Sequence, residues 1–305
     1  MRLLAPAKIN LHLRVGPPRT DGFHPLLSWF ATIALFDTLE LTLRRPDEPG
    51  PLISLRTDRP DMPVDDRNLV VRVGTALADT PGKQPPGLPV RREGVSAILS
   101  KRIPIGGGLG GGSSDAARTL LGLNNLWGIG WSARQLSEFS SRFGSDLPFF
   151  FHGPSSICTG RGEIVRPIDP PKPRFIVLIL PRIAMPTPQV YRRFDEMGLG
   201  CDNTLLDQPD WSRWTTSPAK EILPMLVNDL EAPAFSIAPQ LEALRTDAQR
   251  LLSRIVRMSG SGSSLFTLYD EQDEAEHAAA MIQAQLKLDA RSLQLAPKLS
   301  DDLSV

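Results

Sequence analysis

Residues 104–117 read PIGGGLGGGSSDAA, a stretch dominated by glycine. All residues from Gly106 to Gly112 except Leu109 are glycines. Glycine has no Cβ and tolerates positive φ, so such a run lets several backbone N–H groups converge on one point. Convergent N–H groups bind anions, and the default ligand is the phosphate of a nucleotide.

The segments on both sides of this loop have regular patterns. Residues 95–104 alternate between apolar and polar side chains and are rich in β-forming residues, which predicts a strand. Residues 113–126 place Ala116, Leu120 and Leu123 at helical spacing. A strand, a glycine loop and a helix N-terminus in this order hold a phosphate with amide groups and the helix dipole. The alternative, a flexible glycine-rich linker, has no ordered flanks and is less favoured.

Two well-known glycine motifs do not fit. The P-loop needs a lysine after its last glycine, but Ser113 follows Gly112 here. Gly106, Gly108 and Gly111 satisfy the spacing of a dinucleotide-binding fingerprint. That fingerprint also needs an acidic residue further along for the ribose, and residues 120–135 contain none. The loop is therefore predicted to be a phosphate loop of another kind.

The composition of the chain indicates how many domains it forms and which kind of partner it binds. With 305 residues and 41% hydrophobic content, the chain is expected to form about two domains. Lys plus Arg and Asp plus Glu balance at 34 each, which favours a small-molecule partner over nucleic acid or an acidic membrane. Cys158 and Cys201 are too few for a disulfide framework or a metal cluster. With no export signal or membrane span recognised, we expect a cytoplasmic monomer or homodimer.

The proline-rich residues 167–175 are the best candidate boundary, near residue 170. We therefore expect an α+β N-terminal domain at 1–170 and a C-terminal domain at 171–305. The first domain is expected to contain strands at 7–15, between 26 and 43, at 95–104 and at 155–168, with helices at 68–79, 113–126 and 132–143. The second is expected to contain a strand at 175–181, a strand pair around 254–269, a last strand and a polar tail, with helices at 188–197, 217–231, 239–253 and 273–287. Trp211 and Trp214 are expected on a loop.

Two stretches supply candidates for chemistry. In APAKINLHLRV (5–15), the period of a strand places Lys8, Asn10 and His12 on one face, where the lysine could point into a cleft. A solvated polar face of an edge strand is the alternative. In RFGSDLPFFFHG (142–153), Asp146 lies in apolar company and needs a partner. Its carboxylate could accept the proton of a hydroxyl while Lys8 stabilises charge on a transferring group. A helix N-cap next to Pro148 is the other interpretation, and the two roles are compatible.

Two further stretches could line a ligand site. The turn TDGFHPL (20–26) presents Phe23, which could stack on a base, and His24, which could hydrogen-bond its edge; ordinary packing is the alternative. Residues 257–269, RMSGSGSSLFTLY, form a second glycine turn between two predicted strands. That turn could bring backbone near the same ligand, although a plain hairpin explains it equally well.

The order of these motifs along the chain resembles that of a known family. PAKINLHLRV, DGFHPL, PIGGGLGGGSSDAA, GSDLPFFF, MPTPQVY, NDLE and MSGSGSSLFTLY follow one another as in the GHMP small-molecule kinases. The chain resembles this family from residue 5 to about residue 269. The combination of GGGLGGGSS with PAKINL resembles the branch that phosphorylates the 2-hydroxyl of a cytidyl diphosphate methylerythritol in non-mevalonate isoprenoid synthesis.

The resemblance implies a fold and a chemistry. The expected fold is a two-domain GHMP kinase, with a ribosomal protein S5 domain 2-like N-terminal domain and a ferredoxin-like C-terminal domain. The active site is expected in the cleft between them, where the γ-phosphoryl of ATP passes to a hydroxyl. Magnesium is expected with ATP, held by phosphates and water, so no protein metal ligand is assigned. The alternatives are another GHMP kinase or a non-catalytic nucleotide-binding regulator.

The resemblance also implies roles for individual residues. Asp146 corresponds to the base and Lys8 to its charged partner. The residues expected to bind ATP are Lys101 on the adenine side and Pro104, Ile105, Gly106, Gly107, Gly108, Leu109, Gly110, Gly111, Gly112, Ser113 and Ser114. The residues expected to bind the acceptor are Asn10, Phe23, His24, Thr187 and Tyr191, with Phe23 and Tyr191 around cytosine. Phe23 stands where most relatives have tyrosine, so stacking is expected without the phenol hydroxyl. Residues 198–218 match no motif.

Overall fold

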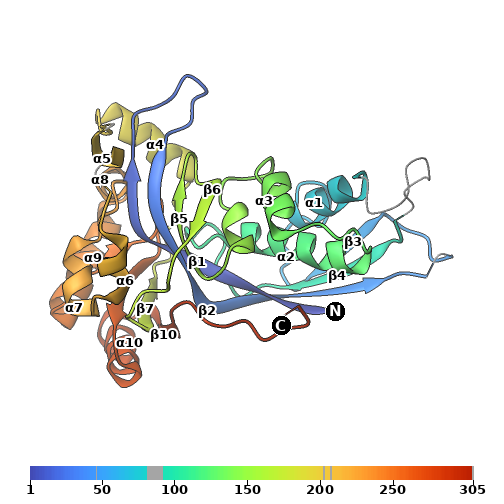
Figure 1. Cartoon of the computed structure of the whole chain (residues 1–305). Coiled ribbons are helices and arrows are strands. Elements are labelled where there is room, and N and C mark those ends of the chain that lie inside the picture. The colour runs from blue at the N-terminus through green and yellow to red at the C-terminus, as the bar shows by residue number, and fades with distance from the viewer. Residues whose placement is uncertain (46, 81–91, 202, 207, 304–305) are drawn as a thin grey trace.

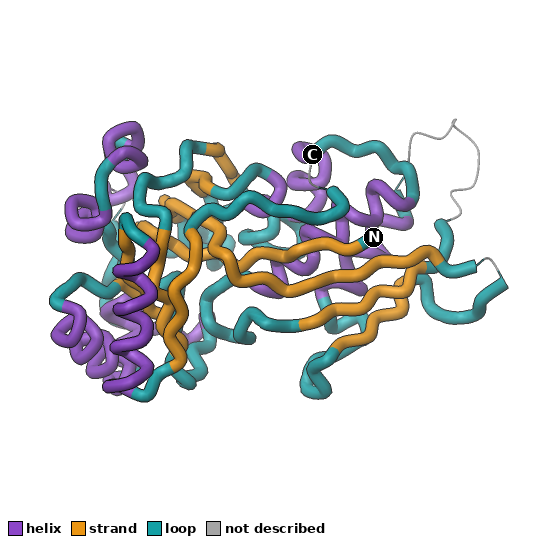
Figure 2. Tube along the Cα trace, turned by 90° about the horizontal axis from the view of Figure 1, so that it is seen from below, coloured by secondary structure: helices purple, strands orange, loops and turns teal. Residues whose placement is uncertain are grey.

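The computed structural model describes residues 1–45, 47–80, 92–201, 203–206 and 208–303. Two sheets lie side by side, with helices packed on each (Figures 1 and 2). The long strands of the first sheet run along the molecule and join the two halves (Figure 1).

The first sheet is built around β2 (Leu26–Leu43). β1 (Arg2–Val15) pairs antiparallel with β2 along most of its length. The strand order is β3-β4-β2-β5-β6, and only the β3–β4 pair in this path is parallel. The other strands are β3 (Ile53–Thr57), β4 (Val95–Ser100), β5 (Ser155–Thr159) and β6 (Ile164–Pro167).

Three helices lie on one face of this sheet (Figure 1): α1 (Leu69–Ala78), α2 (Gly111–Leu126) and α3 (Ala133–Ser140). Side chains cap the N-termini of α1 and α3. The Asn68 side chain accepts a hydrogen bond from the Val70 amide, and Ser132 forms a capping box with Gln135. The expected helices at 68–79, 113–126 and 132–143 are confirmed, each within a few residues.

The second sheet is antiparallel, with strand order β10-β7-β9-β8. Its strands are β7 (Phe175–Leu180), β8 (Arg257–Met258), β9 (Leu265–Tyr269) and β10 (Asp289–Gln294). The helices of this half include α4 (Thr187–Glu196), α5 (Asn203–Leu206), α9 (Pro239–Leu252) and α10 (Gln272–Leu286). The expected helices at 188–197, 239–253 and 273–287 are confirmed.

Three expectations about elements were wrong. The helix expected at 217–231 is broken into α7 (Ala219–Ile222), the 3₁₀ turn η2 (Leu223–Met225) and α8 (Glu231–Ile237), because Pro224 has no N–H for a helical hydrogen bond. Trp211 and Trp214 lie on α6 (Trp211–Thr216), whose N-cap is the Asp210 side chain. The strand expected at 155–168 is the hairpin of β5 and β6, which turns at Gly160 and Gly162, both with positive φ.

The C-terminal tail after β10 returns to the first sheet, so that the two ends of the chain lie close together (Figure 1). The Ala296 amide donates to the Thr32 carbonyl at 2.8 Å, and the Leu4 amide donates to Asp301 at 2.8 Å. Asp301 also forms a buried ion pair with Arg118 of α2. The boundary expected near residue 170 stays a prediction.

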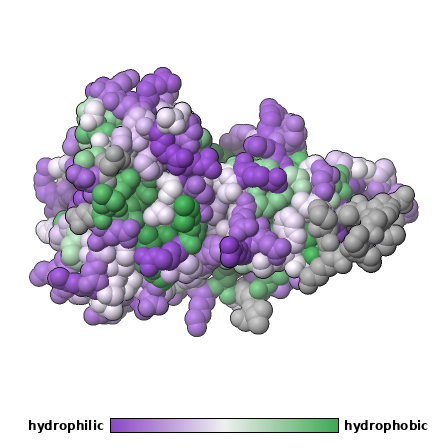
Figure 3. All heavy atoms as spheres, turned by 45° about the horizontal axis from the view of Figure 1, so that its top comes forward, coloured by the Kyte–Doolittle hydropathy of each residue, from purple (hydrophilic) through white to green (hydrophobic). Residues whose placement is uncertain are grey.

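One hydrophobic cluster contains residues from both sheets and fixes how the halves pack. Trp29 of β2 contacts Trp211 and Trp214 of α6, with ring centroids 6.0 and 6.5 Å apart. The surface is hollowed between the two halves (Figure 3). Within the described ranges, no helix combines the length and apolar character needed to cross a bilayer.

Candidate active site

A cavity of about 880 Å³ lies where the two halves meet, and both contribute to its walls. The glycine loop and β1 form one side, the 22–24 turn and α4 another, and the 260–261 turn closes it. The predicted site residues that line it are Lys8, Asn10, Phe23, His24, Lys101, Pro104, Ile105, Gly106, Gly107, Gly108, Leu109, Gly110, Gly111, Gly112, Ser113, Asp146, Thr187 and Tyr191. Ser114 lies behind this wall and is fully buried.

The glycine loop depends on backbone conformations that favour glycine. Gly106, Gly108 and Gly110 have φ values of 75°, 74° and 68°. Gly110 is the N-cap of α2 and has no side chain to bond the first amides of the helix. Those amides, at residues 111–113, belong to the part of the chain that lines the cavity. An uncapped helix N-terminus in a cavity is suited to an anion.

Neighbouring atoms lie so close to Gly108 and Gly110 that a side chain at either position would collide with them. A Cβ on Gly108 would lie 2.7 Å from the Ser259 carbonyl oxygen, and one on Gly110 would lie 2.9 Å from Cγ of Lys8. The Lys8 amide also donates to the Leu109 carbonyl at 2.9 Å. The second glycine turn does connect two strands, β8 and β9, and also brings Gly260 and Ser261 to the cavity wall. The hairpin interpretation is therefore confirmed, and the approach of this turn to a ligand stays a prediction.

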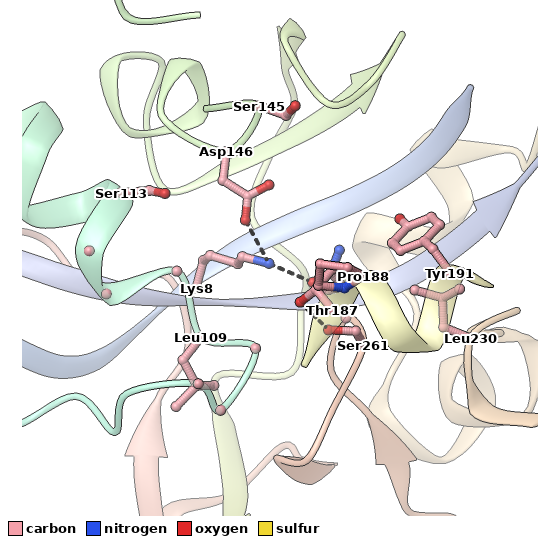
Figure 4. A pocket seen from close by; sticks show the side chains of 18 of the residues that line it. Lys8, Leu109, Ser113, Ser145, Asp146, Thr187, Pro188, Tyr191, Leu230 and Ser261 are labelled. Carbon is pink, nitrogen blue, oxygen red and sulfur yellow. Dashed lines mark hydrogen bonds and ion pairs between the residues drawn. The ribbon is translucent and has the colours of Figure 1, made fainter. Parts of the chain in front are cut away.

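Lys8 and Asp146 point toward each other across the cavity (Figure 4). The Lys8 Nζ lies 3.2 Å from Asp146 Oδ2 and donates to Asn10 Oδ1 at 2.8 Å. The ammonium also lies 4.6 Å from the centroid of the Phe30 ring. Lys8 is only 4% exposed, so the interpretation of this face as a solvated strand edge is wrong.

Asp146 is the accessible member of this pair, because its side chain is 35% exposed. The 3₁₀ turn η1 (Pro148–Phe151) has Leu147 as its N-cap, so Asp146 does not fill the capping position. Its carboxylate is therefore available to a ligand in the cavity.

His12 does not share the face of Lys8 and Asn10, which corrects the expectation from strand period. A register shift between Asn10 and His12 makes their partners the consecutive residues Phe30 and Trp29, which point to opposite faces of β2. His12 packs its ring 5.2 Å from that of Trp214, on the side away from the cavity. Burial, with the charges of Arg14 and Arg257, lowers the pKa of His12 to about 3.

A small network holds Asn10 in place. Its amide nitrogen Nδ2 donates to Ser28 Oγ at 3.0 Å, and its backbone N–H donates to Ser259 Oγ at 3.1 Å. Ser28 Oγ in turn donates to the His12 carbonyl at 2.7 Å. Sequence reasoning missed Ser28 and Ser259 because each comes from a distant strand or turn. Ser259 did lie in the motif that marked the second glycine turn.

Lys101 lines the cavity, but its ammonium is bound by two carboxylates. It donates to Asp115 Oδ2 at 2.7 Å and to Asp37 at a shorter distance. Burial alone would lower the pKa of Lys101, but the charges of Asp115 and Asp37 raise it. Burial also raises the pKa of Asp115 to about 7, against the opposing charge of Lys101. Asp37 carried no sequence signal, whereas Asp115 belongs to the quoted loop.

Aromatic side chains form the other end of the cavity. Phe23 is 48% exposed, and the Arg161 guanidinium lies 4.8 Å from its ring centroid. His24 is buried, with Nδ1 2.9 Å from the Gly16 carbonyl and its ring 5.1 Å from that of Tyr191. Burial, with the charge of Asp146, raises the pKa of Tyr191.

Thr187 and Ser261 connect α4 to the second glycine turn at the cavity wall (Figure 4). Their hydroxyl oxygens are 2.8 Å apart. Among the described residues, no group of three or more His, Cys, Asp or Glu side chains could hold a metal ion.

Comparison with known proteins identifies the family. The family model for the GHMP kinases N terminal domain matches residues 68–154, and that for GHMP kinases C terminal matches residues 218–288. A 4-diphosphocytidyl-2-C-methyl-D-erythritol kinase of Synechococcus sp. (strain CC9902) is 35% identical, over 94% of this chain and 93% of that protein. The chain belongs to the 4-diphosphocytidyl-2-C-methyl-D-erythritol kinases, within the GHMP family. It is therefore a kinase, and the expected GHMP kinase fold is confirmed.

Other members of this kinase family are similarly close. The chloroplastic enzyme of Arabidopsis thaliana is 38% identical, over 87% of this chain and 66% of that protein. A crystal structure of a 4-(cytidine 5'-diphospho)-2C-methyl-D-erythritol kinase matches with a TM-score of 0.75 at 33% identity, covering 97% of this chain and all (100%) of the other. A homoserine kinase from Cytophaga hutchinsonii matches with a TM-score of 0.66 at 15% identity, over 96% of this chain and 94% of that one, which shows the shared fold alone.

We predict that Gly108→Ala disrupts the glycine loop far more than Gly106→Ala. Both residues have φ near 75°, so both substitutions carry a left-handed backbone cost of about 1–2 kcal/mol. Only the Cβ at position 108 also meets a backbone carbonyl, since nothing lies within 4 Å of a Cβ at position 106. Binding of an ATP analogue, measured by calorimetry, should weaken at least ten-fold more in Gly108→Ala. Equal losses in the two variants would contradict the role given to this close approach.

We predict a pH-dependent stability term from Asp115. Its pKa is raised from 3.8 to about 7, so between roughly pH 4 and pH 7 the folded protein keeps a proton that the unfolded chain releases. The free energy of unfolding therefore falls through this window as the pH rises. Asp115→Asn removes the term, so the stability of the variant relative to wild type should increase from pH 4.5 to pH 7.5 in urea titrations.

The matched control for this titration is Asp247→Asn, an exposed carboxylate on α9 that pairs with Arg250. Its stability difference from wild type should change little between pH 4.5 and pH 7.5. Other groups, such as His12, titrate equally in wild type and variant and cancel in the difference. A pH-independent difference for Asp115→Asn would contradict the raised pKa.

Proposed function

We propose that this kinase transfers the γ-phosphoryl group of ATP to the 2-hydroxyl of 4-diphosphocytidyl-2-C-methyl-D-erythritol, in non-mevalonate isoprenoid precursor synthesis. One observation carries the proposal: the Lys8–Asp146 pair and the uncapped N-terminus of α2 line the same cavity. The names of the relatives support the identity of the acceptor.

The glycine loop is the proposed ATP site. Amide groups at the start of α2 and along residues 104–112 are suited to hold the phosphates, and the helix dipole favours their negative charge. The exposed Ile105 side chain and Leu69 provide apolar surface at this end of the cavity for the nucleoside. Ser113 adds a hydroxyl at the first turn of the helix.

Asp146 and Lys8 are the proposed reacting pair. The hydroxyl oxygen of the acceptor attacks the γ-phosphorus, its proton passes to the Asp146 carboxylate, and ADP leaves with the electrons of the broken P–O bond. The ammonium of Lys8, 3.2 Å from Asp146, holds this carboxylate at the cavity. The same ammonium stabilises negative charge on the phosphoryl group as it transfers.

The aromatic end of the cavity is the proposed cytidine site. Phe23 and Tyr191 line this end, and stacking on Phe23 needs no phenol hydroxyl. His24 is proposed to lie at the edge of cytosine, with its Nδ1 2.9 Å from the Gly16 carbonyl and its Nε2 3.4 Å from Asp195 Oδ1. Asn10, which accepts a hydrogen bond from Lys8, and Thr187 also line the cavity, and the methylerythritol part is proposed to bind there.

Magnesium is proposed to arrive with ATP, bound by its phosphates and by water. The cytoplasmic location and a monomeric or homodimeric state also stay predictions. Two free cysteines, one buried and one exposed, are consistent with a reducing compartment.

We predict that Asp146→Asn lowers kcat by about 10²–10⁴-fold, because an amide cannot accept the proton of the hydroxyl. ATP affinity and the unfolding midpoint should change little, since the loop and the fold do not depend on this carboxylate. Steady-state kinetics with both substrates, together with calorimetry, measure these effects.

The control for this substitution is Asp247→Asn, which removes an exposed carboxylate outside the cavity and should retain wild-type kcat. A loss below ten-fold in folded Asp146→Asn would remove Asp146 from the role of base. ATP binding by wild type without turnover of any acceptor would support a nucleotide-binding regulator instead.

We predict that Phe23→Ala raises KM for the cytidyl substrate, with kcat and the KM for ATP nearly unchanged. Losing one base stack costs about 1–3 kcal/mol, which corresponds to roughly five- to 150-fold in KM. Val64 is as exposed as Phe23, at 48%, but is not part of the cavity wall, so Val64→Ala is a matched control. An unchanged KM in Phe23→Ala would favour a GHMP kinase with another acceptor.

A further inference from the structure

Three buried charged side chains meet directly behind the glycine loop. Lys101, Asp37 and Asp115 are each at most 5% exposed, and the ammonium of Lys101 donates to both carboxylates. The Lys101 side chain itself is only 2% exposed. An ammonium has three hydrogens, and two of them are directed at carboxylates here. Little of this cation is left for a ligand.

The three residues come from the elements that enter and leave the loop. Lys101 directly follows β4, and Asp115 lies in the first turns of α2. Asp37, on β2, also accepts hydrogen bonds through Oδ1 from the backbone N–H groups of Arg102 and Ile103. One carboxylate therefore holds the backbone before the glycines while the ammonium connects it to the helix after them.

The contact also lies close to the phosphate-binding backbone. A Cβ on Gly111, the first residue of α2, would be 3.3 Å from Lys101 Nζ and 2.9 Å from Cγ2 of Ile103. The glycine N-cap offers no side chain that could fix this helix start. The position of the amides at 111–113 therefore depends on what lies behind them.

We infer that Lys101, Asp37 and Asp115 are positioning residues that hold the glycine loop in the shape that binds ATP, and that the ammonium of Lys101 is not a direct ligand of the nucleotide. This inference rests on the proposed ATP site. It changes the role that family resemblance implies for Lys101, from contact with adenine to support of the loop.

The cost of burying this cluster favours a functional reason for it. Three ionisable side chains share one buried site, and Asp115 Oδ1 has no hydrogen-bond partner within the described residues. Burying ionisable and unpaired polar groups costs stability, whether or not Asp115 holds a proton, and an apolar core would avoid that cost. What the ion pairs provide is a fixed geometry between β2, β4 and α2 at the one place where the loop begins and ends.

Variants of Asp115 test the inference without touching the cavity wall. Asp115→Ala removes one support, so the dissociation constant for a non-hydrolysable ATP analogue should rise at least ten-fold. KM for ATP should rise in parallel, while kcat and the KM of the acceptor stay within about three-fold. Asp115→Asn keeps an oxygen that can accept from Lys101 and should restore affinity to within about three-fold of wild type. Asp247→Ala, which removes an exposed carboxylate on α9 outside the cavity, is the control.

The same Asp115 variants can also overturn the inference. If Lys101 contacts ATP directly, Asp115→Ala frees its ammonium, and the dissociation constant stays within two-fold of wild type or falls; either result overturns the inference. Where the alanine variant does not fold, Asp115→Glu decides. It keeps the charge but displaces the contact by one methylene, so a ten-fold weaker affinity supports the inference and an unchanged affinity overturns it. Failure of the wild-type protein to bind the analogue would instead refute the proposed ATP site.

Discussion

The close approach of the glycine loop to β1 is the constraint on which the site depends. The hydrogen bond from the Lys8 amide to the Leu109 carbonyl, and the contact of Gly110 with the Lys8 side chain, fix the loop beside this strand. Gly108 brings the same loop against the Ser259 carbonyl of the other half. Larger side chains would separate these backbones. The start of α2, the Lys8–Asp146 pair and the second glycine turn then line one cavity.

The two lysines of this region show how environment decides the role of a charge. Lys8 pairs with one carboxylate that is a third exposed, so Asp146 stays accessible to a hydroxyl in the cavity. Lys101 is held by two carboxylates that are almost completely buried, so its ammonium has structural partners on both sides. Both lysines line the cavity. The proposal gives the first a part in the reaction and the second the support of the glycine loop.

Much of the site could be predicted because its chemistry is local in the sequence. The glycine run, the helix start after it and the polar residues of β1 all follow from short motifs. His12 could not be placed, since a register shift with β2 moves it to the opposite face, and pairing irregularities depend on the partner strand. Asp37 gave no signal because its partners, the Lys101 ammonium and the backbone N–H groups of Arg102 and Ile103, are 64, 65 and 66 positions away. Pro224 by itself predicts a break in the helix expected at 217–231, because proline has no N–H for a helical hydrogen bond.

The most direct test of the central claim is acceptor specificity. Purified protein with ATP and magnesium would be offered 4-diphosphocytidyl-2-C-methyl-D-erythritol, methylerythritol phosphate, mevalonate and homoserine, with ADP release and the phosphorylated product measured. The account predicts turnover confined to the cytidyl compound, with phosphate added at its 2-hydroxyl. Comparable turnover of an acceptor without cytidine would contradict it, because the aromatic end of the cavity would then have no part in selecting the substrate.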